Sequence, residues 1–170
     1  KPPVSLELLQ ALGLAYQNVR SPEPALEVYQ QILADAQQRQ DINSQEETLK
    51  TMGQLQLNWF EYTKAAATYE QLLTLAQGQG DYLQQLAYIY DKEKQPENSL
   101  KAKQKLAESY LNKQDFENLP VLKLAIASDY EALGKPDDAS QNYQEAYSLA
   151  LSIQQYAYAS EALQKMAALY

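Results

Sequence analysis

The sequence contains no cysteine and no histidine, and each absence removes a class of chemistry. Without cysteine there is no disulfide framework, no cysteine zinc site and no thiol nucleophile. Without histidine, the commonest general base and metal ligand are missing. Glycine and proline are scarce, at 5 and 7 of 170 residues, and this scarcity favours helix over nearly the whole chain.

Positive charge is also in short supply. Asp and Glu number 22 against 14 Lys and Arg, and the net charge of −8 argues against a nucleic-acid or anionic-membrane surface. No run approaches the roughly 20 continuous apolar residues of a membrane span, and no secretion signal is recognisable. The chain starts at Lys1 rather than Met, so we expect a fragment of a longer protein. The compartment stays open, with the cytoplasm favoured.

Candidate catalytic groups are few. Two pairs of adjacent acids, Glu46-Glu47 and Asp137-Asp138, do not converge on one point because neighbouring helical residues diverge. Both pairs lie near expected helix starts, where acids stabilise the helix dipole. There is no glycine-rich phosphate loop, no metal-ligand spacing and no base beside a nucleophile. We therefore expect no enzyme, with no catalytic residue, cofactor or metal site.

What the sequence does contain is an internal repeat. A small residue is followed twelve positions later by another small residue, in the pairs Gly13 and Ala25, Gly53 and Ala65, Ala87 and Ser99, and Ala127 and Ala139. The units are spaced by 40, 34 and 40 residues, and a fifth begins with Ala167 after another 40. Aromatic residues recur in the same register, at Tyr16, Tyr90, Tyr130 and Tyr170 and at Tyr29, Tyr69 and Tyr143.

Each unit is predicted to hold two helices, since its apolar residues follow helical spacing. A proline-acid break divides three units, at Pro22, Pro96 and Pro136, and the turn of the second unit, near Phe60, is placed by register alone. The small residues let the two helices of a unit approach closely. The units run over residues 4–41, 42–81, 82–115, 116–155 and a truncated 156–170. The six residues missing from the short unit fall between Asp81 and Ala87, so its first helix should be more than one turn shorter, with Gly78 and Gly80 allowing a tight connection.

This pattern resembles the tetratricopeptide repeat. Unit one reads Leu12, Gly13, Tyr16, Ala25, Tyr29 and Ile32, and unit four reads Ile126, Ala127, Tyr130, Ala139, Tyr143 and Ala146. Gln56 and Lys103 depart from the family pattern, each standing where an aromatic is usual. The prevailing period of 40 is similar to that of kinesin light chains and of bacterial scaffold and signalling proteins. The resemblance implies an all-α, right-handed superhelical solenoid of about 4.5 repeats in one domain, 1–170.

The resemblance also implies a function, which is to bind a protein or peptide segment in the concave groove lined by the first helices. Carried over by register, the groove residues are Gln10, Leu14, Gln17 and Asn18; Lys50, Gln54, Leu57 and Asn58; Gln84, Tyr88, Asp91 and Lys92; and Leu124, Ser128, Glu131 and Ala132. Their mixture of amides, leucine and tyrosine suits a peptide held by backbone hydrogen bonds and a few apolar anchors, with Tyr88 the favoured anchor. It does not fit the clamp that holds carboxylate tails in some members of the family.

Two further features carry predictions. The lysine-rich stretch 92–113 holds Glu97, Lys101, Lys105 and Glu108 at i,i+3 and i,i+4 spacing, which predicts a salt-bridged solvent face. The segments on either side of this stretch are acidic, so they could bind a basic partner, and we expect such binding to weaken as the salt concentration rises.

The C-terminus ends in an apolar face without a second helix to cover it, formed by Leu163, Met166, Ala167 and Tyr170. That face predicts continuation of the chain or self-association, so an oligomerisation module is the alternative function, and peptide-sensing regulation is a third.

Overall fold

The computed structural model of the protein describes residues 4–76 and 81–170, and in these ranges all regular structure is helical. The predicted all-α fold is therefore confirmed. The helices are α1 (Leu6–Asn18), α2 (Pro22–Gln38), α3 (Ile42–Asn58), α4 (Tyr62–Leu75), α5 (Tyr82–Lys92), α6 (Pro96–Asn112), α7 (Leu119–Ala132), α8 (Pro136–Ser152) and α9 (Tyr156–Leu169). The predicted turn at Gly78 and Gly80 lies outside the described residues.

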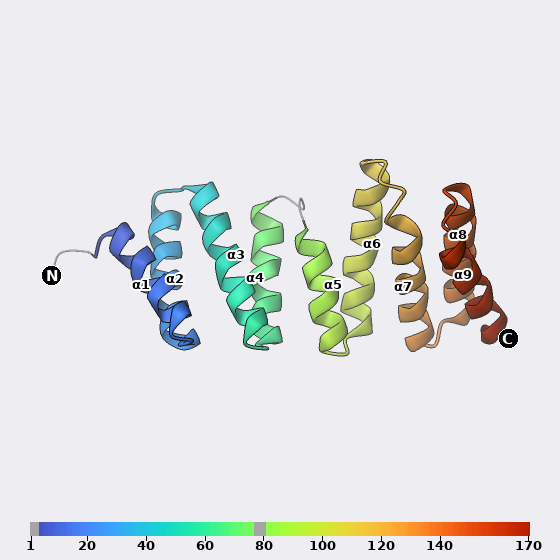
Figure 1. The fold of residues 1–170 in the computed structure, drawn as a ribbon, viewed down its shortest axis with the longest axis horizontal. Helices are drawn as coiled ribbons and strands as arrows, with labels where there is room; N and C mark the ends of the chain where they lie inside the picture. Colours follow the sequence, from blue (N-terminus) through green and yellow to red (C-terminus); the bar gives the residue numbers. More distant parts are fainter. Residues whose placement is uncertain (1–3, 77–80) are drawn as a thin grey trace. The chain divides into compact units, whose positions relative to one another are not determined.

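The chain forms two compact units, Lys1–Tyr82 and Leu83–Tyr170, called here the N-terminal and C-terminal units. In the N-terminal unit α1, α2, α3 and α4 pack in chain order, each on the next (Figure 1). In the C-terminal unit α6, α7, α8 and α9 do the same, and α7 also contacts α9. Within each unit, therefore, packing is between helices close in sequence, as in repeat proteins.

The repeated small residues lie where two helices meet. All eight members of the four pairs are buried, and Ala25, Ala65, Ser99, Ala127 and Ala139 have no exposed surface. At two glycines the space is filled by a tyrosine ring of the following helix. A Cβ added at Gly13 would lie 2.8 Å from Tyr29 Cζ, and one added at Gly53 would lie 2.9 Å from Tyr69 Cε2. The close approach that was predicted for the two helices is therefore, at these two glycines, a contact between the tyrosine ring of the second helix and the backbone of the first.

The turns between helices share one backbone device. Seven of the turns lie in the described part of the chain, and in each one the second residue after the helix has a φ between 54° and 69°. These residues are Arg20, Gln40, Phe60, Lys94, Gln114, Gly134 and Gln154. The next residue donates its N–H back to a carbonyl five positions earlier, as Ser21 does to Tyr16 at 2.9 Å and Gln155 to Ala150 at 2.8 Å. This is the Schellman arrangement, which satisfies carbonyls at a helix C-terminus. Pro22, Pro96 and Pro136 then open the next helix, as predicted.

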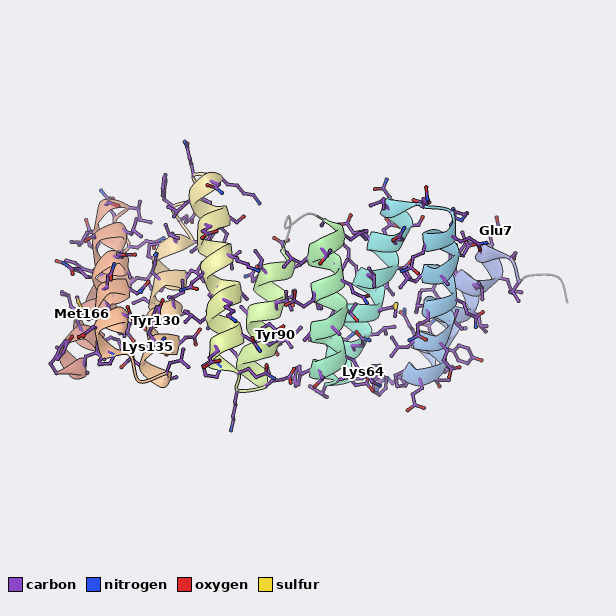
Figure 2. All side chains as sticks on the ribbon, turned by 180° about the vertical axis from the view of Figure 1, so that it is seen from behind. Glu7, Lys64, Tyr90, Tyr130, Lys135 and Met166 are labelled. Atoms are coloured by element: carbon purple, nitrogen blue, oxygen red, sulfur yellow. The ribbon has the colours of Figure 1, made fainter. Side chains whose placement is uncertain are left out.

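Three expectations from the sequence are met only in part or not at all. Helix α5 has 11 residues against 17 in α3, which is more than one turn, but α1 has 13 and α7 has 14. Leu163 of α9 and Tyr170 directly after it are exposed. Met166 of α9 instead packs against the core of the C-terminal unit, as Tyr130 of α7 does; Figure 2 labels both side chains. The prediction of a salt-bridged solvent face on α6 is wrong. Its four residues are exposed but form no ion pair within the described residues; they are Glu97, Lys101, Lys105 and Glu108.

No helix in the described part of the chain is both long enough and apolar enough to cross a membrane.

Gly53→Ala should destabilise the protein although it improves helix propensity. Overpacking against the Tyr69 ring costs about 1–3 kcal/mol, and the propensity gain of up to about 1 kcal/mol offsets only part of it. In a Tyr69→Ala background the ring is gone, so the same substitution should become stabilising. Urea unfolding of the four proteins of this cycle measures both effects, and a penalty that persists without the ring would contradict the contact.

Gly134→Ala should lower the free energy of unfolding by about 1 kcal/mol through backbone strain alone. A Cβ at Gly134 meets nothing within 4 Å, but the residue has a φ of 69°, which costs L-residues about 1–2 kcal/mol. The matched variant is Gln114→Gly, at the equivalent turn with a φ of 57°, and it should gain about 0.5 kcal/mol. Equal effects of the same sign in thermal unfolding would refute this account of the turns.

Candidate binding grooves

A polar pair links the two helices in three of the four repeats. One member lies four residues after the first small residue, and the other lies four residues after the second. Gln17 Nε2 donates to the Tyr29 hydroxyl at 2.7 Å, Lys103 Nζ donates to Asp91 Oδ1 at 3.1 Å, and the Tyr143 hydroxyl donates to Glu131 Oε2. Burial raises the pKa of Tyr143, and the bond to Glu131 raises it further. These pairs hold groove-side residues of the first helix against the second.

The second repeat breaks this pattern. Leu57 stands where the other repeats have Gln17, Asp91 and Glu131, so Tyr69 has no polar partner on the facing helix. Tyr69 is only 5% exposed, and burial raises the pKa of its hydroxyl. Within the described residues this hydroxyl takes part in no hydrogen bond. Among the three tyrosines at this register position, it is the one whose hydroxyl has no hydrogen-bond partner in the described part of the chain.

Tyr69 lines a cavity of about 400 Å³ in the N-terminal unit. The other residues around this N-terminal cavity are Gln17, Lys50, Thr51, Gln54, Leu55 and Asn58. Four of them, Gln17, Lys50, Gln54 and Asn58, are predicted groove residues. Gln54 Nε2 donates to Asn58 Oδ1 at 2.9 Å, and this bond leaves Gln54 Oε1 and both amide hydrogens of Asn58 available. The cavity thus offers hydrogen-bond donors and acceptors side by side.

The charge of Lys50 is already compensated. Its ammonium lies 3.5 Å from Glu46 Oε1 and 5.7 Å from the centroid of the Tyr82 ring. The Tyr82 hydroxyl donates to the same carboxylate oxygen, and this bond lowers the pKa of Glu46. Glu46 therefore stays ionised at neutral pH and neutralises the one cation that lines the N-terminal cavity.

A second cavity, of about 310 Å³, lies in the C-terminal unit. Three predicted groove residues, Gln84, Tyr88 and Asp91, line it. Most of the remaining surface of this C-terminal cavity is apolar or aromatic, from Ala87, Leu106, Tyr110, Val121, Leu122 and Ala125, with Lys103 and Asn118 adding polar groups. Tyr88 is half-exposed, and the ammonium of Lys92 lies 5.4 Å from its ring centroid. This lining fits a ligand that places a large apolar group in the cavity and a polar group beside it.

Lys103 is a buried part of this cavity wall and not a surface lysine. Its side chain is 9% exposed, and its ammonium reaches Asp91 Oδ1 at 3.1 Å and Asp129 Oδ2 at 2.8 Å. Ser99 Oγ also donates to Asp91 Oδ1, at 2.6 Å. Burial raises the pKa of Asp129, although the bond to Lys103 opposes the shift. An ion pair across three helices thus replaces the tyrosine found in the other repeats.

The remaining predicted residues lie apart from the two cavities. Gln10, Leu14 and Asn18 are exposed on α1, Ser128, Glu131 and Ala132 are exposed on α7, and Leu57 is half-buried. Leu124 is a correction: it is 7% exposed and belongs to the core of the C-terminal unit with Ala162 of α9. Because α7 and α9 contact each other, this position is covered by protein and is not open to a ligand.

Sequence reasoning missed two other cavities, each lined by two second helices and by the first helix between them in the chain. One of about 620 Å³ is lined by Gln37 of α2, Gln45 and Leu49 of α3, and Glu70, Gln71, Thr74 and Leu75 of α4. The other, of about 550 Å³, is lined by Leu111 of α6, Leu119 and Lys123 of α7, and Gln141, Gln144, Glu145, Ser148 and Leu149 of α8. In the second, Lys123 and Glu145 pair at 2.7 Å. Both involve second helices, to which the repeat pattern assigns only packing.

Tyr69 and Lys103 were also missed as cavity residues, because the repeat register marks both positions as core. A signal for each is present in the sequence. Leu57 in place of a polar residue leaves Tyr69 unpaired, and Asp91 and Asp129 are acids within reach of a lysine that replaces an aromatic. Among the described residues, no group of three acidic side chains is placed to hold a metal ion.

Solved structures of low sequence identity have the same fold. A STAND protein (signal transduction ATPase with numerous domains) from Pyrococcus horikoshii, with a tetratricopeptide repeat sensor, superposes with a TM-score of 0.64 and 17% identity, over 99% of this chain. Our chain spans only 28% of that protein's length. TPR-like repeats of a kinesin light chain from Podosopora anserina give a TM-score of 0.57 and 14% identity, over 96% of this chain and 94% of that one.

A third similar structure is PcrH, a protein of Pseudomonas aeruginosa, in complex with the chaperone binding region of PopD. It gives a TM-score of 0.56 and 21% identity, over 72% of this chain and 89% of that one. No protein-family model and no curated protein matches the sequence. At these identities the likeness establishes the fold.

Lys103→Met should destabilise the protein by about 3–5 kcal/mol at pH 7, because it leaves the buried carboxylate of Asp129 without its cation. The penalty should shrink as the pH falls through the raised pKa of Asp129, since protonation there removes the buried charge. Urea unfolding between pH 7 and pH 4 measures both effects. Lys101→Met, on the exposed face of the same helix, should change stability by less than about 0.5 kcal/mol at either pH. A penalty independent of pH would contradict the ion pair.

Proposed function

From the tetratricopeptide-repeat fold of this chain, we propose that it is a protein-interaction module that binds segments of another protein along its first helices. The N-terminal and C-terminal cavities are the two contact sites, each considered within its own unit. The observation that carries the proposal is the N-terminal cavity, where amide groups of α1 and α3 and the accessible hydroxyl of the otherwise buried Tyr69 surround one solvent-open space. Groups of this kind bond peptide N–H and C=O groups without requiring a charged ligand.

The C-terminal cavity supports the proposal through different chemistry. Its apolar lining and half-exposed Tyr88 suit an apolar side chain of the bound segment, because aromatic residues at the centre of an interface contribute most to affinity. Asp91, held by Ser99 and Lys103 through Oδ1, keeps its other oxygen available at the rim. A partner that combines apolar and hydrogen-bonding side chains is therefore favoured, and the similar fold of PcrH, crystallised with a region of PopD, is consistent with a protein ligand.

A scaffold or adaptor role follows from this proposal, and catalysis plays no part in it. Self-association is a second candidate, favoured by the exposed Leu163 of α9 and the exposed ring of Tyr170 directly after α9. Packing against a second copy would cover the apolar surface of both side chains. Sedimentation of wild type and of a Leu163→Glu variant over a range of concentrations tests this candidate. A monomer at every concentration would exclude it.

Binding is tested by selecting random 12-residue peptides displayed on phage against the immobilised 170-residue chain. Tyr88→Ala should weaken the binding of peptides that occupy the C-terminal cavity about tenfold or more, because it removes one of the two tyrosines that line that cavity. Fluorescence polarisation with labelled peptides measures the loss, and circular dichroism checks that helix content is kept. Phe116→Ala is the matched control, since Phe116 is similarly exposed but does not line the cavity. Equal affinities for wild type and Tyr88→Ala would remove Tyr88 from the site.

A further inference from the structure

The Tyr69 hydroxyl differs from its counterparts in what it is bonded to. Tyr29 and Tyr143 occupy the same register position, and their hydroxyls are bonded to Gln17 and Glu131 across the helix pair. The Tyr69 ring is as deeply buried as theirs, yet its hydroxyl has no hydrogen-bond partner within the described residues. Because the hydroxyl oxygen itself keeps accessible surface at the end of the buried ring, a hydrogen-bonding group from outside the protein can reach it.

The geometry around Tyr69 points this hydroxyl toward the N-terminal cavity. The ring lies over Gly53, where an added Cβ would come within 3.4 Å of the hydroxyl oxygen itself. Gln54 is the next residue on α3 and Asn58 lies one turn further, and both line the same cavity. A ligand group in this cavity therefore meets the hydroxyl, which donates and accepts, together with the spare amide groups of Gln54 and Asn58.

Charge decides which ligand group fits best. Lys50 is the one charged residue that lines the cavity, and Glu46 and the Tyr82 ring already engage it. An anionic ligand would have to compete with Glu46, and a cationic ligand would meet Lys50 itself. A neutral group that both donates and accepts hydrogen bonds matches the lining, and among protein side chains the carboxamide has this property.

We propose that the N-terminal cavity takes the carboxamide side chain of an asparagine or glutamine in the bound protein segment, and that the Tyr69 hydroxyl is the specificity-determining group that reads it. This inference rests on the proposed function, because it names the side chain that one of the two contact sites accepts. On this proposal the specificity depends on Leu57, since a polar residue at that position would form a hydrogen bond with the Tyr69 hydroxyl, as Gln17 does with Tyr29.

The test uses the complete 170-residue chain and peptides obtained from the random 12-residue selection. Fluorescence polarisation compares wild type, Tyr69→Phe and Leu57→Gln, with Tyr143→Phe as the matched control. Tyr69→Phe should weaken binding about tenfold without lowering the melting temperature, because no bond inside the protein is lost. Leu57→Gln should weaken binding similarly by giving the hydroxyl an internal partner. Tyr143→Phe should keep the affinity and lower the melting temperature, because it breaks the bond to Glu131.

The carboxamide is tested on the peptide side by replacing each Asn or Gln in turn with Leu. One replacement should cost wild type about tenfold in affinity and cost Tyr69→Phe almost nothing, which is the coupling expected of two groups in contact. If peptides bind wild type and Tyr69→Phe equally, the inference is overturned while the proposed function stands. It is also overturned if binding requires an acidic side chain or a free C-terminal carboxylate. If no peptide is enriched at all, both the inference and the proposed function fail.

Discussion

The contact that organises the first two repeats is the one between a tyrosine ring on the second helix and a glycine on the first helix of the same repeat. Gly13 under Tyr29 and Gly53 under Tyr69 leave no room even for a methyl group. This contact sets how closely the two helices approach, because the ring fills the space that a side chain on the first helix would otherwise occupy. It also fixes which residue of the first helix lies opposite the ring's polar end, and so determines where the grooves have free hydrogen-bonding groups.

The turns carry the pattern from one pair to the next. Seven turn residues in the described part of the chain share the left-handed conformation, although Gly134 is the only glycine among them. The bond from the following N–H to a carbonyl five residues back is formed at each of these turns, and it compensates the backbone cost of residues such as Phe60 and Gln154. The backbone geometry is thus conserved between repeats while the side chain at that position varies freely.

The variation that matters for function lies at the polar end of the ring contact. The first and fourth repeats close it with Gln17 and Glu131, and the third replaces the ring by Lys103 between two carboxylates. A buried ammonium with two acids is stable only as a complete set, so Lys103, Asp91 and Asp129 depend on one another. The second repeat, with Leu57, leaves the end open. The same register position, closed in three repeats and open in the second, therefore contributes to two cavities of different chemistry.

The sequence by itself determined the helices, their pairing and the buried small residues. The helical spacing of apolar residues and the position of the small residues are local properties, and they recur in each repeat. It also identified Gln17, Lys50, Gln54, Asn58, Gln84, Tyr88 and Asp91, which line the cavities, since their register places them on one face of the first helices. Tertiary structure alone decided the rest. Leu124 is covered because α7 meets α9, and Lys103 is buried because acids of α5 and α7 converge on it. The Tyr69 hydroxyl lacks a hydrogen-bond partner within the described residues because the residue opposite, Leu57, is apolar. Each of these outcomes depends on what another helix places against a side chain, and a register within one repeat does not contain that information.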